Sequence, residues 1–265
     1  MSLSFCSLSS GSSGNCYIIK SERTALLVDA GISGKKILEG LAALGTAPEE
    51  IMGILVTHEH IDHVKSVKVL TKKLPYVNVY ASRGTWECIN DKVDIEKQRV
   101  VFAGREFVLG DITVRPFALS HDAVEPVGYA FEQGGKQISI VTDTGIVTEE
   151  IHSVIKCADL LVIEANHDVH TIQFCNYPYT VKRRIMGNFG HLSNDAAAEE
   201  ICRICNEDDK YREVVLAHLS KETNFPEMAY QTIKNSIEEK NIYIGRNIEL
   251  DIIVRDSISP VFTLE

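Results

Sequence analysis

Short apolar runs separated by polar turns recur along the whole chain and predict a mixed α/β protein. Runs of four to seven residues are typical of buried strands, whereas apolar residues spaced three and four apart are typical of helices. Amphipathic spacing predicts helices over 37–44, 62–74, 148–155, 194–204 and 227–236, the first of them ending at Gly45. Strands are predicted over 17–19, 25–28, 54–56, 77–80, 100–102, 107–109, 112–117, 127–131, 138–141, 160–163 and 214–217.

Glycine-containing turns connect several of these strands and indicate hairpins. Gly110-Asp111 and Gly134-Gly135 each lie between two predicted strands. After residue 148 helices and strands alternate. The chain has no low-complexity stretch and no Pro/Gly-rich linker, so we expect residues 1–265 to form a single domain.

Composition narrows the class of protein and its cellular location. The formal net charge of −10 argues against a protein that coats nucleic acid non-specifically. No apolar run approaches the length of a membrane span, and the Ser-rich start does not resemble a signal peptide. The seven cysteines are scattered and odd in number, which favours reduced thiols and hence a cytoplasmic location. Cys202 and Cys205 lie in a predicted helix without a second pair, so we interpret them as packing residues.

The segment 57–63, Thr-His-Glu-His-Ile-Asp-His, carries the clearest chemical signal. It follows an apolar strand and places His58, His60, Asp62 and His63 within six positions. Three of the nine histidines in the chain therefore lie in this one short segment. Alternate residues of an extended segment share a side, so the first three can converge, and the following turn brings His63 towards them. Imidazole and carboxylate groups are ligands for divalent zinc, manganese or iron. A solvated polar turn is the weaker interpretation.

Three further metal-competent residues each follow a predicted strand. His121 comes after 112–117, Asp143 after 138–141, and His218 after 214–217. Side chains just beyond strand ends project over the edge of a sheet, and together with segment 57–63 they are enough ligands for two divalent ions. The sequence therefore predicts a dinuclear metal site.

The order of these residues resembles that of the metallo-β-lactamase-fold hydrolases over nearly the whole chain. The resemblance implies a four-layer αββα sandwich with the metals at one edge of its two sheets. It further implies that His58, His60 and His121 hold one metal, that Asp62, His63 and His218 hold the other, and that Asp143 bridges them. Asp29, which ends Leu-Leu-Val-Asp-Ala-Gly, corresponds to an Asp that supports the ligand loop by hydrogen bonds.

Further matches point to the phosphodiesterase branches of that family. The run 9–16, Ser-Ser-Gly-Ser-Ser-Gly-Asn-Cys, resembles a loop that approaches the substrate, with Ser12 and Asn15 as candidate contacts. Glu164-Ala165 and His191-Leu192-Ser193 resemble segments of ribonuclease Z that assist proton transfer; the alternative is a strand end and a helix cap. Taken together, the chain resembles most closely the WalJ/YycJ group, which implies a cytoplasmic nuclease that acts on DNA.

The implied chemistry is hydrolysis of a phosphodiester by a metal-activated hydroxide. Asp62 would position the nucleophile, His191 would protonate the leaving alkoxide, and Glu164 would orient His191. Lys182 and Arg183, in the triplet 182–184, would contact neighbouring phosphates. Phe174, Tyr177 and Tyr179 are candidates either for stacking on bases or for ordinary packing. The acidic chain leaves only a narrow track for a polymer, which favours single strands or ends.

Several alternatives stay open at this level. A thioester or lactone hydrolase would use the same metals on a carbonyl group. A non-catalytic nucleic-acid-binding regulator on the same scaffold would normally have lost a ligand. Zinc and manganese suit the His/Asp ligands equally, iron is also compatible, and DNA, RNA or a smaller phosphodiester all fit as substrate. Neither a membrane nor an obligate protein partner is indicated.

Overall fold

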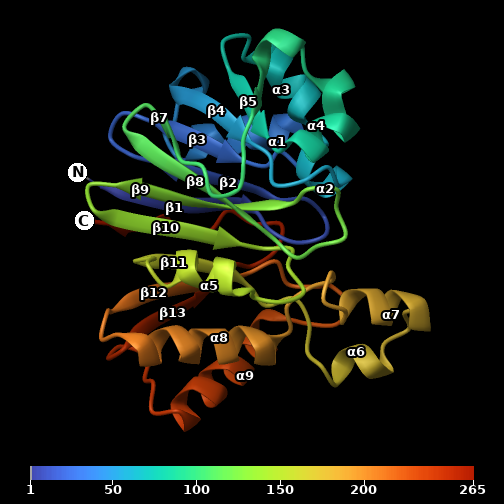
Figure 1. Ribbon diagram of the computed structural model, residues 1–265, viewed down its shortest axis with the longest axis vertical. Coiled ribbons are helices and arrows are strands. Elements are labelled where there is room, and N and C mark those ends of the chain that lie inside the picture. The colour runs from blue at the N-terminus through green and yellow to red at the C-terminus, as the bar shows by residue number, and fades with distance from the viewer. Residues whose placement is uncertain (1) are drawn as a thin grey trace.

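Two seven-stranded mixed sheets lie face to face in the computed structural model, which describes residues 2–265 (Figure 1). In spatial order the first sheet contains β14 (Phe262–Leu264), β1 (Leu3–Ser9), β2 (Cys16–Lys20), β3 (Ala25–Val28), β4 (Ile51–Leu55), β5 (Asn78–Ala81) and β6 (Gln98–Val100). The second contains β13 (Ile248–Ile252), β12 (Arg212–Ala217), β11 (Leu160–Glu164), β10 (Lys136–Val141), β9 (Val127–Gln133), β8 (Ile112–Ala118) and β7 (Phe107–Leu109).

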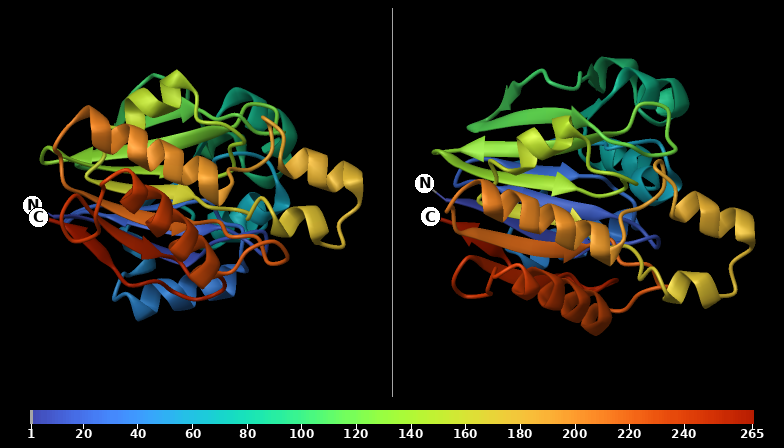
Figure 2. Two further views of the ribbon diagram at one scale, coloured as in Figure 1. Left: turned by 90° about the horizontal axis from the view of Figure 1, so that it is seen from below. Right: turned by 60° about the horizontal axis from the view of Figure 1, so that its bottom comes forward.

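Helices cover the outer face of each sheet, and the chain therefore forms four layers (Figures 1 and 2). The first sheet is covered by α1 (Gly34–Ala43), α3 (Val67–Lys73) and α4 (Arg83–Ile89). The second is covered by α5 (Glu149–Ile155), α8 (Asn194–Glu207) and α9 (Pro226–Glu239). The remaining elements are α2 (Ile61–Val64), α6 (Thr171–Phe174), α7 (Tyr179–Ile185) and 3-10 turns at Pro48–Glu50, Asn90–Lys92 and Ile95–Lys97.

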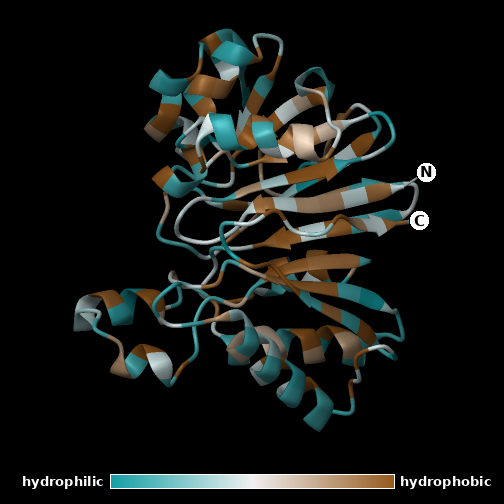
Figure 3. Ribbon diagram, turned by 180° about the vertical axis from the view of Figure 1, so that it is seen from behind, coloured by the Kyte–Doolittle hydropathy of each residue, from teal (hydrophilic) through white to brown (hydrophobic). Residues whose placement is uncertain are grey.

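Three separate hydrophobic clusters hold the layers together. One lies between the two sheets and includes Phe5, Tyr17 and Tyr129, while the other two lie between each sheet and its helices. The central strands of both sheets are buried on both faces, so their ribbons are largely hydrophobic, whereas the covering helices carry hydrophobic and hydrophilic bands (Figure 3). The expected αββα sandwich is confirmed.

The carboxyl ends of the central parallel strands meet at one edge of the sandwich. β3 pairs in parallel with β4, and β10, β11 and β12 pair in parallel with one another. Loops that leave these strands therefore lie side by side, far from the chain termini (Figure 1). Among residues 2–265, none of the helices combines the length and the apolar composition that a membrane span requires.

The observed elements depart from the predicted ones in a few places. The helix expected over 62–74 is interrupted, because Ser66 donates its backbone N–H to Ala30 and its hydroxyl to the Ile32 carbonyl. β6 lies two residues earlier than the strand expected over 100–102. The pattern of the sequence did not predict β1, β13, β14, α4, α6 or α7.

Candidate metal centre

The loop that follows β4 carries four of the predicted ligands and is held by Asp29. The Asp29 carboxylate is fully buried and accepts hydrogen bonds from the Thr57 amide at 2.8 Å and the Thr57 hydroxyl at 2.9 Å. It also lies 2.7 Å from Nδ1 of His63. A buried carboxylate on Nδ1 orients the imidazole and directs Nε2 towards the opposite side. Asp29 thus fixes both ends of the ligand loop.

Close backbone packing fixes the turn at Asp62 and His63. The Asp62 carbonyl accepts from the amide of Asn15, and the His63 carbonyl accepts from the amide of Ala30. A Cβ atom at Gly31 would lie 1.6 Å from the Asp62 carbonyl oxygen, so only glycine allows this approach. The glycine of the Asp-Ala-Gly segment therefore has a packing role in the ligand loop.

Three site residues adopt a left-handed backbone conformation that side-chain-bearing residues rarely use. Asp29, Asp143 and His218 have φ angles of 62°, 60° and 55°. Each follows a strand, at a position where regular alternation would point its side chain to the helical face of the sheet. The left-handed turn interrupts this alternation and brings the side chains into the centre. Such backbone strain concentrates at functional sites.

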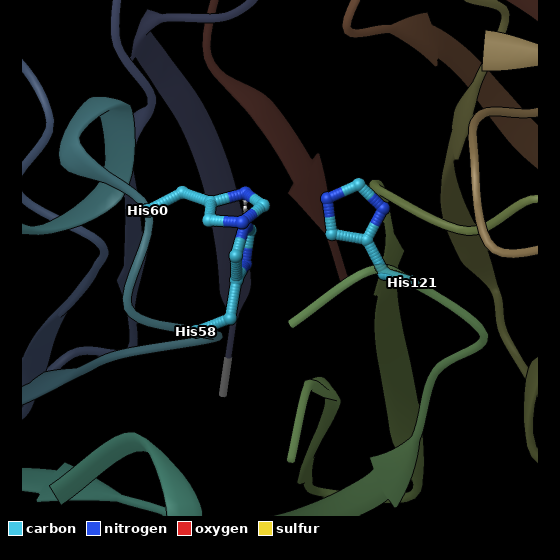
Figure 4. A group of neighbouring side chains, drawn as sticks. All are labelled: His58, His60 and His121. Atoms are coloured by element: carbon cyan, nitrogen blue, oxygen red, sulfur yellow. Dashed lines mark hydrogen bonds between the residues drawn. The ribbon is translucent and has the colours of Figure 1, made fainter. Parts of the chain in front are cut away.

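The first group of candidate ligands contains His58, His60 and His121. Figure 4 shows His58 and His60 on one loop, facing His121 on a separate segment. One ligand nitrogen from each of the three residues lies within 4.8 Å of the other two. The His121 ring is held in place because its Nδ1 lies 3.0 Å from the Gly190 carbonyl.

The second group contains Asp62, His63 and His218, and its ligand atoms also lie within 4.8 Å of one another. Asp143 lies between the two groups. Its Oδ1 is 3.5 Å from His218 Nε2 and 3.9 Å from His121 Nε2, and its Oδ2 is 3.5 Å from His63 Nε2. The structure thus brings all seven predicted ligands together, with Asp143 in the central position.

Glu164, the last residue of β11, lies behind the centre. Its Oε1 is 2.8 Å from Nδ1 of His191 and 2.7 Å from Nδ1 of His218. Its Oε2 accepts from the amides of Thr144 and Leu192. The carboxylate is fully buried, so Glu164 positions two imidazoles and does not itself reach the cavity. The predicted link between Glu164 and His191 is present, whereas the link to His218 was not anticipated.

The charges of the centre favour a cation. Burial would lower the pKa of His63, but Asp29 and Asp143 outweigh it and raise that pKa to about 10. Burial likewise opposes protonation of His191, but Glu164 and Asp143 raise its pKa to about 9. Burial and neighbouring imidazoles hold the pKa of His58 well below its usual value, which keeps that ring neutral. Because imidazole ligates metals in its neutral form, a bound cation would take the place of the proton on His63.

Two buried polar atoms indicate that the donor set fits a metal. Asp143 Oδ2 and His218 Nε2 have no hydrogen-bond partner among residues 2–265, although both are shielded from solvent. Such unsatisfied groups are costly unless a ligand compensates them. Both point into the region that the seven candidate ligands surround. The centre therefore has the chemistry of a divalent-metal site.

A cavity of about 340 Å³ opens onto the centre, and only one of the four predicted substrate contacts lines it. Ser12 lines it, but Asn15 is fully buried: its Oδ1 accepts from the Gly11 amide, and its Nδ2 lies 3.0 Å from His63 Nε2. Asn15 therefore packs beside a candidate ligand and does not face the cavity. Lys182 and Arg183 do not line this cavity, whereas Arg184, the third member of the triplet, does.

The structure also places residues to which the sequence had assigned no individual role at the centre. Asn166 lines the cavity and donates from its side chain to the His218 carbonyl at 2.9 Å. Arg184 forms an ion pair with Asp122, next to His121. His152 lies elsewhere, buried between Glu200 and Glu207. Asn166 carried one signal, its place directly after Glu164-Ala165.

Comparison with known proteins agrees with this geometry. A model of the β-lactamase superfamily domain matches residues 24–218. Exodeoxyribonuclease WalJ of Streptococcus pneumoniae is 37% identical over 96% of this chain and 95% of its own length. Exodeoxyribonuclease YycJ of Bacillus anthracis is 36% identical over 94% of this chain and 95% of its own.

A solved structure extends the likeness to the fold. The metallo-β-lactamase fold protein YhfI of Bacillus subtilis superposes with a TM-score of 0.73 at 14% identity, covering 99% of this chain and 100% of its own. At that identity the likeness concerns the fold alone. The family model and the full-length relatives together identify this chain as a member of the metallo-β-lactamase superfamily, in the family of WalJ and YycJ.

Proposed function

We propose that this protein is a metal-dependent phosphodiesterase that degrades DNA as an exonuclease. The observation that carries the proposal is the His191 ring, which is hydrogen-bonded to buried Glu164 and lines the same cavity as His60, Asp62 and His121. A proton donor beside a divalent-metal site suits cleavage of an ester whose leaving group is a strong base. The names of the full-length relatives WalJ and YycJ, both exodeoxyribonucleases, support DNA as the substrate.

The cofactor in this proposal is a pair of divalent ions. His58, His60 and His121 would hold one, Asp62, His63 and His218 would hold the other, and Asp143 would contact both. When bound, the ions supply a nucleophilic water at neutral pH and neutralise charge on the phosphate. Zinc and manganese both suit this set of nitrogen and oxygen donors, and iron is also compatible.

Protein side chains orient the attacking water and protonate the leaving oxygen. Asp62 lines the cavity, where its carboxylate would orient the attacking water by accepting a hydrogen bond from it. Glu164 holds Nδ1 of His191 at 2.8 Å, so the proton that His191 donates to the leaving oxygen sits on Nε2. Glu164 and Asp143 raise the pKa of His191 to about 9 against the effect of burial, which favours the protonated ring that this step requires.

Substrate contacts divide between the cavity and its surroundings. Ser12 and Arg184 line the cavity and are placed to hydrogen-bond a phosphate next to the scissile one. Lys182 and Arg183 lie on α7, outside the cavity, where they would contact phosphates farther along the strand.

Hydrolysis of two substrates tests the function. We expect the protein, after treatment with a chelator and reloading with zinc or manganese, to cleave both bis-p-nitrophenyl phosphate and a fluorescent single-stranded DNA. Chelated protein should cleave neither. Hydrolysis of thioesters or lactones without cleavage of either phosphodiester would contradict the proposal.

A His191→Ala variant tests the role of the proton donor. We expect its DNA cleavage to fall by about 10²- to 10⁴-fold, the range for loss of a general acid. Hydrolysis of bis-p-nitrophenyl phosphate should fall far less, because p-nitrophenolate leaves without protonation. The measurement is the ratio of kcat values for the two substrates. An equal loss on both would assign His191 to metal positioning instead.

A further inference from the structure

Exposed lysines follow the ligand loop and lead away from the metal centre. α2 begins at Ile61, which lines the cavity of the centre together with Asp62. Lys65 lies one helical turn after Ile61, to whose carbonyl its amide donates at 3.0 Å, so the two side chains share a face. Lys68 and Lys72 are four residues apart on α3 and also share a face. These three exposed residues, Lys65, Lys68 and Lys72, form a lysine stripe that starts at the mouth of the cavity.

Charge along this segment is opposite to that of the whole protein. Residues 64–86 contain lysine and arginine but no aspartate or glutamate, in a chain with 37 acidic residues and a net charge of −10. Lysines elsewhere, such as Lys20, Lys35 and Lys234, each pair with a glutamate. Within the described residues 2–265, no member of the lysine stripe has an acidic partner of this kind. The stripe therefore presents uncompensated positive charge to solvent.

Helix stability does not explain the position of Lys68. The start of a helix carries partial positive charge, so acidic residues stabilise it and cations oppose it. Lys68 is the second residue of α3, and no acidic residue lies in the first turn of that helix. The neighbouring helix α1 repeats this arrangement, with Lys35 and Lys36 in its first turn and no acidic residue. Exposed side chains that oppose the stability of their own helices are typical of surfaces that serve binding.

The lysine stripe is held at a fixed position relative to the candidate ligands. The Ala30 amide donates to the His63 carbonyl, and the Ala30 carbonyl accepts from the Ser66 amide at 2.8 Å, between α2 and α3. α1 packs closely on α3, because a Cβ atom at Gly34 would lie 3.2 Å from Cγ1 of Val69. Both helices are thereby joined to the ligand loop.

The stripe extends one wall of the cavity into the outer helical layer. Ile61 of α2 and Arg184 of α7 both line the cavity, so it is bounded by a helix from each half of the sandwich. Figure 1 shows α2 on the side of the molecule that faces away from the termini, with α3 among the helices that cover the first sheet. A polyanion that occupies the cavity can therefore continue past Ile61 onto Lys65.

We propose that the lysine stripe binds the phosphate backbone of DNA outside the cavity, through the ammonium groups of Lys65, Lys68 and Lys72. The inference rests on the proposed function and deepens it, because it names the surface that holds the DNA beyond the scissile phosphate. Lysine ammonium groups bind phosphates as point charges and do not read base edges. This contact is therefore independent of base sequence and sensitive to salt.

Fluorescence anisotropy of a labelled 20-base-pair DNA, measured in a chelator over a series of salt concentrations, tests the stripe. A duplex is the probe because its dense phosphate charge gives the larger salt dependence, about 0.9 in the slope of log K against log salt for each neutralised phosphate. We expect Lys65→Ala with Lys68→Ala to reduce this slope by about 2 and to weaken binding at low salt. Addition of Lys72→Ala should reduce the slope by about one more.

A matched control and a stability measurement accompany the binding experiment. Lys234→Ala with Lys240→Ala removes the same charge from α9, which covers the second sheet, and should leave the slope unchanged. The melting temperature of Lys68→Ala should not fall, because the substitution removes a cation from the start of α3 and alanine is the better helix former. A lower melting temperature with unchanged DNA affinity would assign Lys68 to the fold and overturn its role in binding.

Different outcomes separate the inference from the proposed function. An unchanged slope in the Lys65→Ala, Lys68→Ala variant, with wild-type protein still cleaving DNA, would overturn the lysine stripe alone. An equal reduction in the α9 control would show that net charge, rather than this surface, governs binding. Failure of metal-loaded wild-type protein to cleave any phosphodiester would overturn the function itself.

Discussion

Asp143→Asn is expected to reduce kcat/KM for phosphodiester hydrolysis by at least about 10³-fold. Asp143 lies between the two groups of candidate ligands, within 3.9 Å of nitrogens from His63, His121 and His218. Loss of its negative charge removes the group that would contact both ions. The metal-to-protein ratio, measured by mass spectrometry, should fall together with activity.

Asparagine is chosen at position 143 because it removes the negative charge of the carboxylate without disturbing the backbone conformation. Asp143 has a φ of 60°, which Asn adopts more readily than Ala. A change in the melting temperature of metal-free protein would therefore reflect the lost charge beside His63, His121 and His218 and not a strained backbone. Asp111→Asn is a suitable control, because its carboxylate is also hydrogen-bonded, to Ser21 and Thr24, but belongs to the β7–β8 turn away from the centre. An Asp143→Asn protein that keeps its full metal content and activity would show that the central placement is wrong.

The sequence predicted the centre well because strand order and strand ends are local features. Apolar runs that are followed within a few residues by His121, Asp143 and His218 imply that these residues lie just beyond strand ends. Parallel pairing of β10, β11 and β12 then places two of those ends together at one edge. The αββα layers follow from strands that are apolar on both faces and helices that are apolar on one.

Orientation was less predictable, because it depends on backbone angles and helix rotation. Alternation along the strands would direct Asp143 and His218 away from the centre, and only their left-handed conformation turns them inward. In α7, successive side chains are rotated by about 100°, so Arg184 faces the cavity while its neighbours Lys182 and Arg183 do not. The basic triplet indicated a cationic site, but not which member reaches it.

Elements without a hydrophobic pattern of their own were missed for a different reason. β1 contains Ser7 and Ser9, which are polar yet buried, so its sequence lacks the apolar run of a central strand. β13 and β14 form sheet edges, where short segments are paired by the fold rather than by their own pattern. Tertiary contacts, rather than local propensity, determine these strands.

Glu164→Gln is expected to lower metal affinity by about 10- to 100-fold, the usual cost of losing a partner of a metal-bound histidine. The four groups around this carboxylate are Nδ1 of His191, Nδ1 of His218 and the amides of Thr144 and Leu192. All four point donors at it. A glutamine has the same size but only one acceptor oxygen, so its NH₂ group must face two donors in either orientation.

This mismatch affects two functions of the centre at the same time. His218 loses the bond that directs its Nε2 to the metal, and His191 loses the carboxylate that raises its pKa against the effect of burial. Besides the loss of metal affinity, we therefore expect kcat on DNA, measured at saturating metal, to fall by about 10²-fold. The kcat on bis-p-nitrophenyl phosphate should fall less. Metal titrations followed by activity on both substrates separate the two losses.

Glu200→Gln provides the matched control for the buried position of Glu164. Glu200 is 6% exposed and lies 2.5 Å from Nδ1 of His152, so it is also a buried carboxylate paired with a histidine, but on α8 and away from the cavity. Its substitution should lower the free energy of unfolding by about 1–3 kcal/mol and leave metal affinity unchanged. If Glu164→Gln behaved in the same way, Glu164 would stabilise the fold without tuning the metal centre.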